Sequence, residues 1–250
     1  MDSDWRKRIQ IFLIIALVLG GLRVAWIFYE RRQPVGPAAE NKPTYSSNGD
    51  DYVHLPKIYS YDLASANRDL TGKTVWVRGG YTVPYYAYDP ASGEVDLKHQ
   101  KGLLPPLAKL QIQKVIVQRI PAQLKPGEVS VVQKQAFAIY KRAGSPTHEA
   151  VSIATVNGDD FTLTANETFF FADPHELYKH WPAETWAAID GHEAKPGMSE
   201  LQAGLALGTS ASAGSGDYGN REIEYTNGGH PVKVSFQNNR ATSVTPEAAK

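Results

Sequence analysis

The chain has 250 residues, 26 basic and 26 acidic side chains that leave no net formal charge, and no cysteine. The charge balance and the scatter of Lys and Arg give no electrostatic attraction to nucleic acid, so no nucleic-acid partner is predicted. The lack of cysteine excludes disulfides, thiolate zinc sites, cysteine nucleophiles and a lipid-modified N-terminal cysteine.

The first element in chain order is an apolar run, IQIFLIIALVLGGLRVAWIFY, at Ile9–Tyr29. As a helix it would reach roughly 30 Å, the thickness of a bilayer core. With the preceding basic residues Arg6, Lys7 and Arg8, it predicts a single transmembrane helix within an anchor of residues 1–32, with the lipid bilayer as partner. The expected location is the inner (cytoplasmic) membrane, with the soluble part in the periplasm. The alternative is a cleaved signal peptide, which the length of the run and Arg23 near the cleavage position disfavour.

Residues 33–54 are rich in Pro, Gly, Asn, Ser and charge, a composition that predicts a flexible tether. Residues 55–172 show no helical periodicity but several short runs typical of strands. These are KTVWVRG, KLQIQKVIVQ, VVQKQAFAIYKR, EAVSIATV and DFTLTANETFFF. Short strands separated by turn residues predict a β-rich, small-barrel domain, closed or half closed.

Four tyrosines stand close together in the stretch YTVPYYAYDP of this domain: Tyr81, Tyr85, Tyr86 and Tyr88. Clustered tyrosines can form a stacking platform for a glycan or a peptide. The alternative is that they are ordinary strand residues, some packed on the barrel and some on its surface.

The periodicity changes at residue 173 and predicts an α+β domain over residues 173–245. Asp173 before Pro174 is an N-cap signal, and a second helix begins at Ser199, which forms a capping box with Gln202 and ends at Gly208. The runs REIEYT, PVKVSF and RATSV alternate as strands. Two helices on a three-stranded antiparallel meander make a two-layer fold, followed by a polar tail of residues 246–250.

The stretch GSGDYGN contains G-x-G-x-x-G at Gly214, Gly216 and Gly219. A dinucleotide site needs a strand before these glycines and a helix after them. The sequence predicts a helix end before and a strand after, so no nucleotide partner is expected. The stretch is predicted to be a flexible loop in which alanine at Gly216 costs at most about 1 kcal/mol.

Three histidines, His175, His180 and His192, fall near Asp173 and Glu193, which together supply enough ligands for a metal ion. Their spacing does not place them on one helix face, so no cofactor is predicted. A metal-dependent enzyme built on His175–His192 is kept as a minor alternative.

The segments GMSELQAGLALGT and EIEYTNGGHPVKVSFQNNRATSV resemble the SmpA/OmlA (BamE-like) family of bacterial envelope proteins, and β-lactamase-inhibitor-like domains look like the same fold. The matching positions are Gly197, Met198, Ser199, Leu207, Gly208, Tyr225, Val234 and Phe236. The resemblance implies a fold for residues 173–245; the matched residues are caps and core positions and carry no site. The chain departs from the family in lacking the lipid-bearing cysteine and in having Thr209 where the family has proline.

The sequence therefore favours a membrane-anchored bacterial envelope protein that is not an enzyme and that binds another envelope protein or the cell wall. The first alternative is a glycan- or peptide-binding module that uses the tyrosines of residues 81–88. The second is the metal-dependent enzyme.

Overall fold

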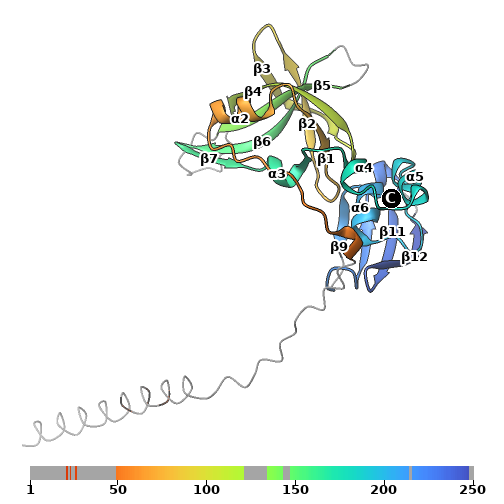
Figure 1. Ribbon diagram of the computed structural model, residues 1–250. Coiled ribbons are helices and arrows are strands. Elements are labelled where there is room, and N and C mark those ends of the chain that lie inside the picture. Colours follow the sequence, from red (N-terminus) through yellow and green to blue (C-terminus); the bar gives the residue numbers. More distant parts are fainter. Residues whose placement is uncertain are drawn as a thin grey trace, which may run out of the picture. The chain divides into compact units, whose positions relative to one another are not determined.

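The computed structural model describes Gly21, Arg23, Trp26 and residues 49–120, 134–142, 147–213 and 216–247 (Figure 1). The chain divides into two units, Met1–Thr44 and Tyr45–Lys250. The second unit carries both sheets and all the side chains discussed below.

The predicted fold class is wrong in its N-terminal transmembrane helix. Across the part of the chain that is described, no helix is long and apolar enough to cross a membrane. Apart from Gly21, Arg23 and Trp26, the run Ile9–Tyr29 lies outside the described residues. The architecture observed is instead two β-sheets accompanied by short helices.

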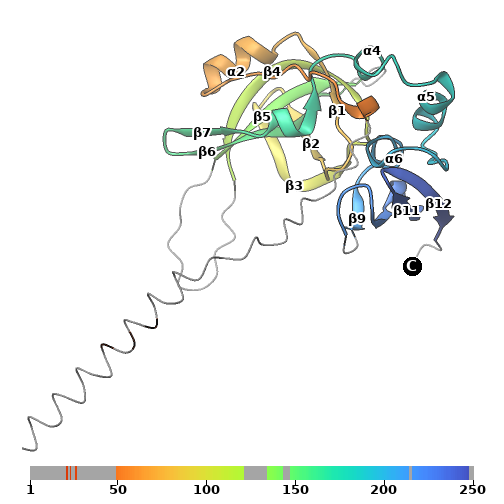
Figure 2. The ribbon, with the colours of Figure 1, turned by 60° about the horizontal axis from the view of Figure 1, so that its bottom comes forward.

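The first part of the second unit is β-rich, as predicted. Its elements are η1 (Gly49–Asp51), α2 (Leu63–Leu70), β1 (Thr74–Val77), β2 (Pro84–Asp89), β3 (Glu94–Leu103), β4 (Lys109–Arg119), β5 (Lys134–Lys141), β6 (Glu149–Asn157), β7 (Asp160–Leu163), α3 (Ala165–Thr168) and β8 (Phe169–Phe170). They form an eight-stranded sheet in the order β3-β2-β6-β5-β4-β1-β8, and β7 pairs with β6. Its ladders are antiparallel, and the sheet curls strongly in Figure 2.

Side-chain amides make contacts that backbone ladders do not. Gln118 on β4 accepts a hydrogen bond from the Val95 N–H (2.6 Å) and donates one to the Val95 carbonyl (2.8 Å), so it joins the curled sheet's β3 edge to β4. Asn67 on α2 does the same to Val115, at 2.7 and 3.0 Å, and fixes the helix on β4. We call this pattern, in which one amide binds both polar groups of one residue's backbone, an amide bridge.

Helix α2 was not predicted. Its N-cap Asp62 accepts from the Ser65 backbone N–H, and the Ser65 hydroxyl accepts from the Asp62 N–H, which is a capping box with serine in place of Glu or Gln. The buried residues Ala66 and Leu70 of α2 pack with strand residues such as Leu110 in an apolar core, which we call the first core. The N-cap and tertiary packing thus stabilise a helix that is too short to be predicted from its own sequence.

The second part is built on a smaller sheet. Its elements are α4 (Pro174–Leu177), α5 (Ala183–Asp190), α6 (Glu200–Leu207), β9 (Ser210–Ala213), β10 (Glu222–Tyr225), η2 (Asn227–Gly229), β11 (Val232–Gln237) and β12 (Arg240–Pro246). The sheet order is β12-β11-β10-β9, so the predicted meander is present as β10–β12 but has a fourth strand. The capping box of Ser199 and Gln202 is present at the start of α6.

Strand β9 corrects the interpretation of the glycine stretch. The residues SASA, which precede the glycine stretch, form β9, an edge strand that pairs antiparallel with β10. The glycine stretch therefore connects two neighbouring strands. Gly214 lies outside the described residues. Gly216 has φ 154°, and a Cβ there would lie 2.8 Å from the Asn220 carbonyl oxygen. The expectation that alanine is tolerated at Gly216 is therefore wrong, because the added carbon would strike backbone.

A second apolar core, which we call the second core, contains residues from both sheets. It contains Ile189, Leu205 and Val234 of the smaller domain, together with Phe170 from β8 and the partly buried Trp76 from β1. Residues of the large sheet thus complete the apolar core over which α5 and α6 pack.

Residues 52–61, which we call the strap, run from η1 to α2 across both parts (Figure 1). Val53 and Leu55 pack against the second core, and Ile58 is buried in the first. Asn166 makes an amide bridge to Ile58, at 3.0 Å from its N–H and 2.8 Å to its carbonyl. Next to the strap, the Asp51 carboxylate accepts 3.0 Å hydrogen bonds from Ser199 Oγ and from the side-chain amide of a β11–β12 turn residue.

Candidate functional site

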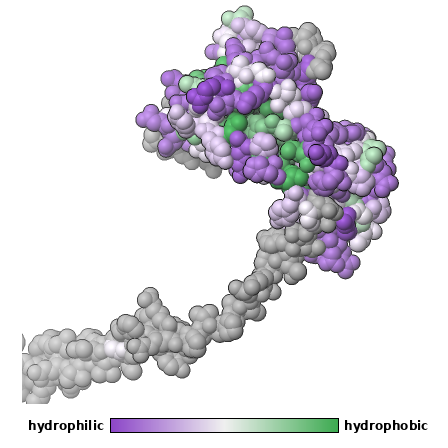
Figure 3. Space-filling model, in the orientation of Figure 1, coloured by the Kyte–Doolittle hydropathy of each residue, from purple (hydrophilic) through white to green (hydrophobic). Residues whose placement is uncertain are grey.

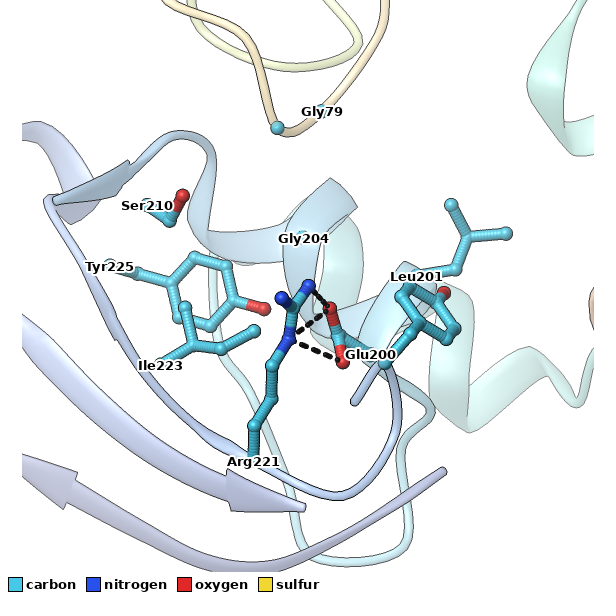
Figure 4. Close-up of a pocket in the computed structure, with 10 residues that line it drawn as sticks. Gly79, Glu200, Leu201, Gly204, Ser210, Arg221, Ile223 and Tyr225 are labelled. Atoms are coloured by element: carbon cyan, nitrogen blue, oxygen red, sulfur yellow. Dashed lines mark hydrogen bonds and ion pairs between the residues drawn. The ribbon is translucent and has the colours of Figure 1, made fainter. Parts of the chain in front are cut away.

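A cavity of ≈ 210 Å³ lies between α6, strands β9 and β10, and the loop that follows β1 (Figure 4). We call it the α6–β9 pocket. Its lining residues are Gly79, Gly80, Glu200, Leu201, Gly204, Ser210, Tyr218, Arg221, Ile223 and Tyr225.

An ion pair occupies one wall of the pocket. Glu200, the first residue of α6, is 6% exposed, and the Arg221 guanidinium binds both of its carboxylate oxygens through Nε and Nη2. The Gly219 backbone N–H donates a further 2.8 Å hydrogen bond to Oε2. The hydrogen bonds of the Arg221 guanidinium to the Glu200 carboxylate are the main cause that raises the pKa of Arg221. The two charges compensate each other in a place where either one alone would be costly to bury.

The pocket also contains a hydroxyl group with no partner. Tyr225 is 3% exposed, its side chain points toward Arg221 in Figure 4, and its hydroxyl makes no hydrogen bond within the described part of the chain. Burial raises the pKa of Tyr225, and the negative charge of Glu200 adds to the effect. Tyr218, also on the pocket wall, has a raised pKa for the same two reasons. Both hydroxyls are protonated near neutral pH, as an ordinary tyrosine is, and can donate hydrogen bonds.

Gly79 lets the loop after β1, which we call the roof loop, come close to α6. A Cβ at Gly79 would lie 2.4 Å from the Gly204 carbonyl oxygen on α6, a distance at which backbone would have to move. The hydroxyl of Thr209 donates a 2.8 Å hydrogen bond to the Tyr81 carbonyl and ties the same loop to the start of β9. The loop after β1 is thereby held against α6, so the pocket is preformed.

The pocket's chemistry is that of a hydrogen-bond donor site. The Glu200 carboxylate is already bound by a guanidinium and a backbone N–H, which leaves it poorly placed to take a proton from a substrate. The Tyr225 hydroxyl, at the end of a side chain that is 3% exposed, offers a hydrogen-bond donor to the pocket. The arrangement suits the binding of a group that carries a hydrogen-bond acceptor.

The tyrosines considered as a stacking platform or as ordinary strand residues are Tyr81, Tyr85, Tyr86 and Tyr88. Tyr85 packs against the first core, whereas Tyr86 and Tyr88 belong to a separate apolar cluster in which Tyr86 meets Phe137 edge-on. Tyr88 is 6% exposed, and Tyr81 lies 49% exposed in the roof loop. The structure does not bring the four rings onto one surface, because successive side chains of β2 point to opposite faces.

The histidines kept as alternative metal ligands, His175, His180 and His192, each have other neighbours. His175 stacks on Trp186 with ring centroids 4.0 Å apart, and His180 lies beside other aromatic rings. The Nδ1 of His192 is 3.2 Å from the Ala206 carbonyl oxygen. Within the described ranges, no group of three or more His, Cys, Asp or Glu side chains is arranged to hold a metal ion.

Sequence reasoning missed the ion pair and the strap. Glu200 resembles an ordinary acidic residue in the first turn of a helix, and its partner Arg221 comes from the far side of a loop. The strap does carry a pattern typical of a packed segment, because more buried and more exposed residues alternate along much of it. Its tyrosines are all exposed: Tyr52 74%, Tyr59 81% and Tyr61 70%.

In comparisons with protein-family models, with curated proteins and with solved structures, nothing matches the chain. The resemblance of residues 173–245 to the SmpA/OmlA family stays a prediction.

Proposed function

We propose that the chain is a non-catalytic protein-binding module and that the strap is the surface that meets its partner. The observation that carries the proposal is the row of three tyrosines, 70–81% exposed, within the ten residues of the strap. Tyrosine is enriched at the energetic centres of protein interfaces because it adds large apolar area and a hydrogen-bonding tip.

The way the strap is held supports this proposal. Ile58 and Ser60, which alternate with the exposed tyrosines, are 7% and 5% exposed, and the amide bridge from Asn166 fixes the backbone between them. A segment fixed before binding loses little conformational entropy when the partner docks. On the face that shows the strap, hydrophobic side chains gather in the middle and hydrophilic ones surround them (Figure 3).

The pocket gives further support for a binding role. Its one carboxylate is hydrogen-bonded to a guanidinium and a backbone N–H, and its remaining polar groups are hydroxyl donors. The setting we propose, from the resemblance of residues 173–245 alone, is the bacterial cell envelope.

The test is photo-crosslinking in living cells with the full chain. A photoreactive phenylalanine analogue placed at Tyr59 should give one dominant adduct with another protein. The matched control is the same analogue at Tyr81, which is also exposed but lies off the strap. Equal adducts from both positions, or none from Tyr59, would contradict the proposal.

A further inference from the structure

The edge strands of the two sheets are not equally protected against pairing with another chain. Strand β3 carries Glu94, Asp96, Lys98 and Lys101, and β12 begins at Arg240 and ends at Pro246. Charged side chains and proline are what usually prevent an edge from accepting another strand. Strand β9 has neither charge nor proline: it consists only of serine and alanine, Ala211 and Ser212 are exposed, and its edge is limited instead by its length of 4 residues and by a bulge at Ala211.

The α6–β9 pocket lies beside this uncharged edge. Ser210 on β9 pairs with Tyr225 on β10, so their side chains share one face, and both line the pocket. A strand added next to β9 would point every second side chain toward the same face. One of these side chains would come to the pocket, where the Tyr225 hydroxyl can donate a hydrogen bond.

The opposite face of the small sheet offers a charge. Lys233 contacts Glu222 at 3.3 Å and Glu247 at 3.1 Å. Glu224, which is paired in register with Ser212 and Lys233, has no ion pair within the described residues. An added strand that carries a basic side chain on this face would complement it, since a lysine or arginine side chain is long enough to reach across β9.

We propose that β9 is a docking edge for an extended peptide segment of another protein, which directs a lysine or arginine toward Glu224 and a hydrogen-bond-acceptor side chain toward the Tyr225 hydroxyl. Backbone hydrogen bonds to β9 supply affinity, and the two alternating side chains supply specificity. The strap residues take no part, so this site goes beyond the function proposed above and can fail or hold independently of it.

The test uses the purified full chain and two fluorescent synthetic peptides of alternating valine and threonine. One peptide carries lysine at the positions that would lie on the Glu224 face of the sheet and a central asparagine on the Tyr225 face. The other peptide is the same except that glutamate replaces the lysines. In a fluorescence-polarisation titration, the lysine peptide should bind at least about tenfold more tightly than the glutamate peptide.

Matched variants locate the site. Ala211 has no partner in the β9–β10 register, and Thr242 has the same place in the β11–β12 register. Ala211→Pro should therefore leave the small sheet folded, as checked by its melting temperature, and weaken the lysine peptide at least about tenfold. Thr242→Pro, on the opposite edge, should leave binding unchanged.

Two further variants test the side-chain contacts. Glu224→Lys should reverse the preference in favour of the glutamate peptide. Tyr225→Phe should weaken binding of the lysine peptide severalfold, because its central asparagine would lose the hydroxyl donor. The proposal is overturned if neither peptide binds, or if Ala211→Pro and Thr242→Pro have equal effects, or if Glu224→Lys leaves the preference unchanged. A wild-type dimer that Ala211→Pro converts to monomer in sedimentation would also overturn it, because β9 would then pair with a second copy.

Discussion

Gly219 lies in the β9–β10 connection against the turn between β11 and β12. Its φ is 79°, and a Cβ there would lie 2.9 Å from Asn239 Cβ and 3.0 Å from the Asn239 Cα and N atoms. The backbone contact also positions the Gly219 N–H that binds Glu200. At this residue glycine is required twice, by its conformation and by the space.

Gly219→Ala should destabilise the chain by about 2–3 kcal/mol, because the strain of a positive φ and a backbone clash add. Gly228→Ala is the control, since Gly228 also has a positive φ of 62° but no atom within 4 Å of the added carbon. Urea unfolding should show a loss of only about 1 kcal/mol for the control. Equal losses would show that the contact with Asn239 is unimportant.

Tyr225 makes stability depend on pH in the alkaline range. Because burial raises its pKa in the folded state, the protonated form contributes stability that is fully present below the unfolded pKa of about 10 and is lost as pH rises toward the folded value. Tyr225→Phe should reduce the fall in unfolding free energy above about pH 10 by up to about 1.4 kcal/mol per pH unit. Tyr59→Phe, at an exposed position, should leave the slope as in the wild type.

At the scale of elements, the strap depends on one amide bridge. Asn166 binds both backbone polar groups of Ile58, although the two residues lie 108 positions apart in the sequence. Asn166-Glu167-Thr168 has the N-x-T pattern of a glycosylation acceptor. The Asn166 side chain is instead hydrogen-bonded to the strap backbone. Among the described residues, the bridge links α3 to the strap backbone through both polar groups of Ile58.

Asn166→Asp should loosen the strap, because the carboxylate keeps the acceptor for the Ile58 N–H but faces the Ile58 carbonyl without a donor. The expected loss in unfolding free energy is about 1–3 kcal/mol. Limited proteolysis should cut within residues 52–61 sooner than in the wild type. Asn157→Asp, an exposed change of the same chemistry at the end of β6, should do neither. A strap that stays equally resistant would argue against the bridge.

The elements that the sequence predicts are those whose signal is local. The alternation in KLQIQKVIVQ and in PVKVSF corresponds to β4 and β11, and the capping box at Ser199 begins α6. The sequence does not predict strand β9, because serine and alanine have low strand propensity. What makes it a strand is its ladder with β10, a tertiary contact that no local pattern shows.

At the scale of the whole molecule, residues 45–250 form one unit. Trp76 and Phe170 of the large sheet pack in the core of the smaller one, and the strap contacts both cores. The candidate site reflects this organisation, since the pocket needs Gly79 from one part and Glu200 from the other. Sequence reasoning that assigned each part its own residues could find caps and strands but not a pocket assembled from both.

Shared packing should make the unit unfold cooperatively. Differential scanning calorimetry of the full chain should show a single transition for the folded unit, with equal calorimetric and van't Hoff enthalpies. Truncation of the shared contact by Trp76→Ala should lower the midpoint of that transition without splitting it. Two separate transitions in the wild type would show that the two parts fold independently.

The most direct test of the protein-binding function is a calorimetric titration of the full chain with the partner identified by crosslinking at Tyr59. The double variant Tyr59→Ser/Tyr61→Ser should bind at least about 2 kcal/mol more weakly than the wild type, because it removes two exposed aromatic anchors from a fixed segment. Tyr81→Ser, the matched change off the strap, should bind as the wild type does. A double variant with unchanged affinity and an unchanged melting temperature would contradict the account.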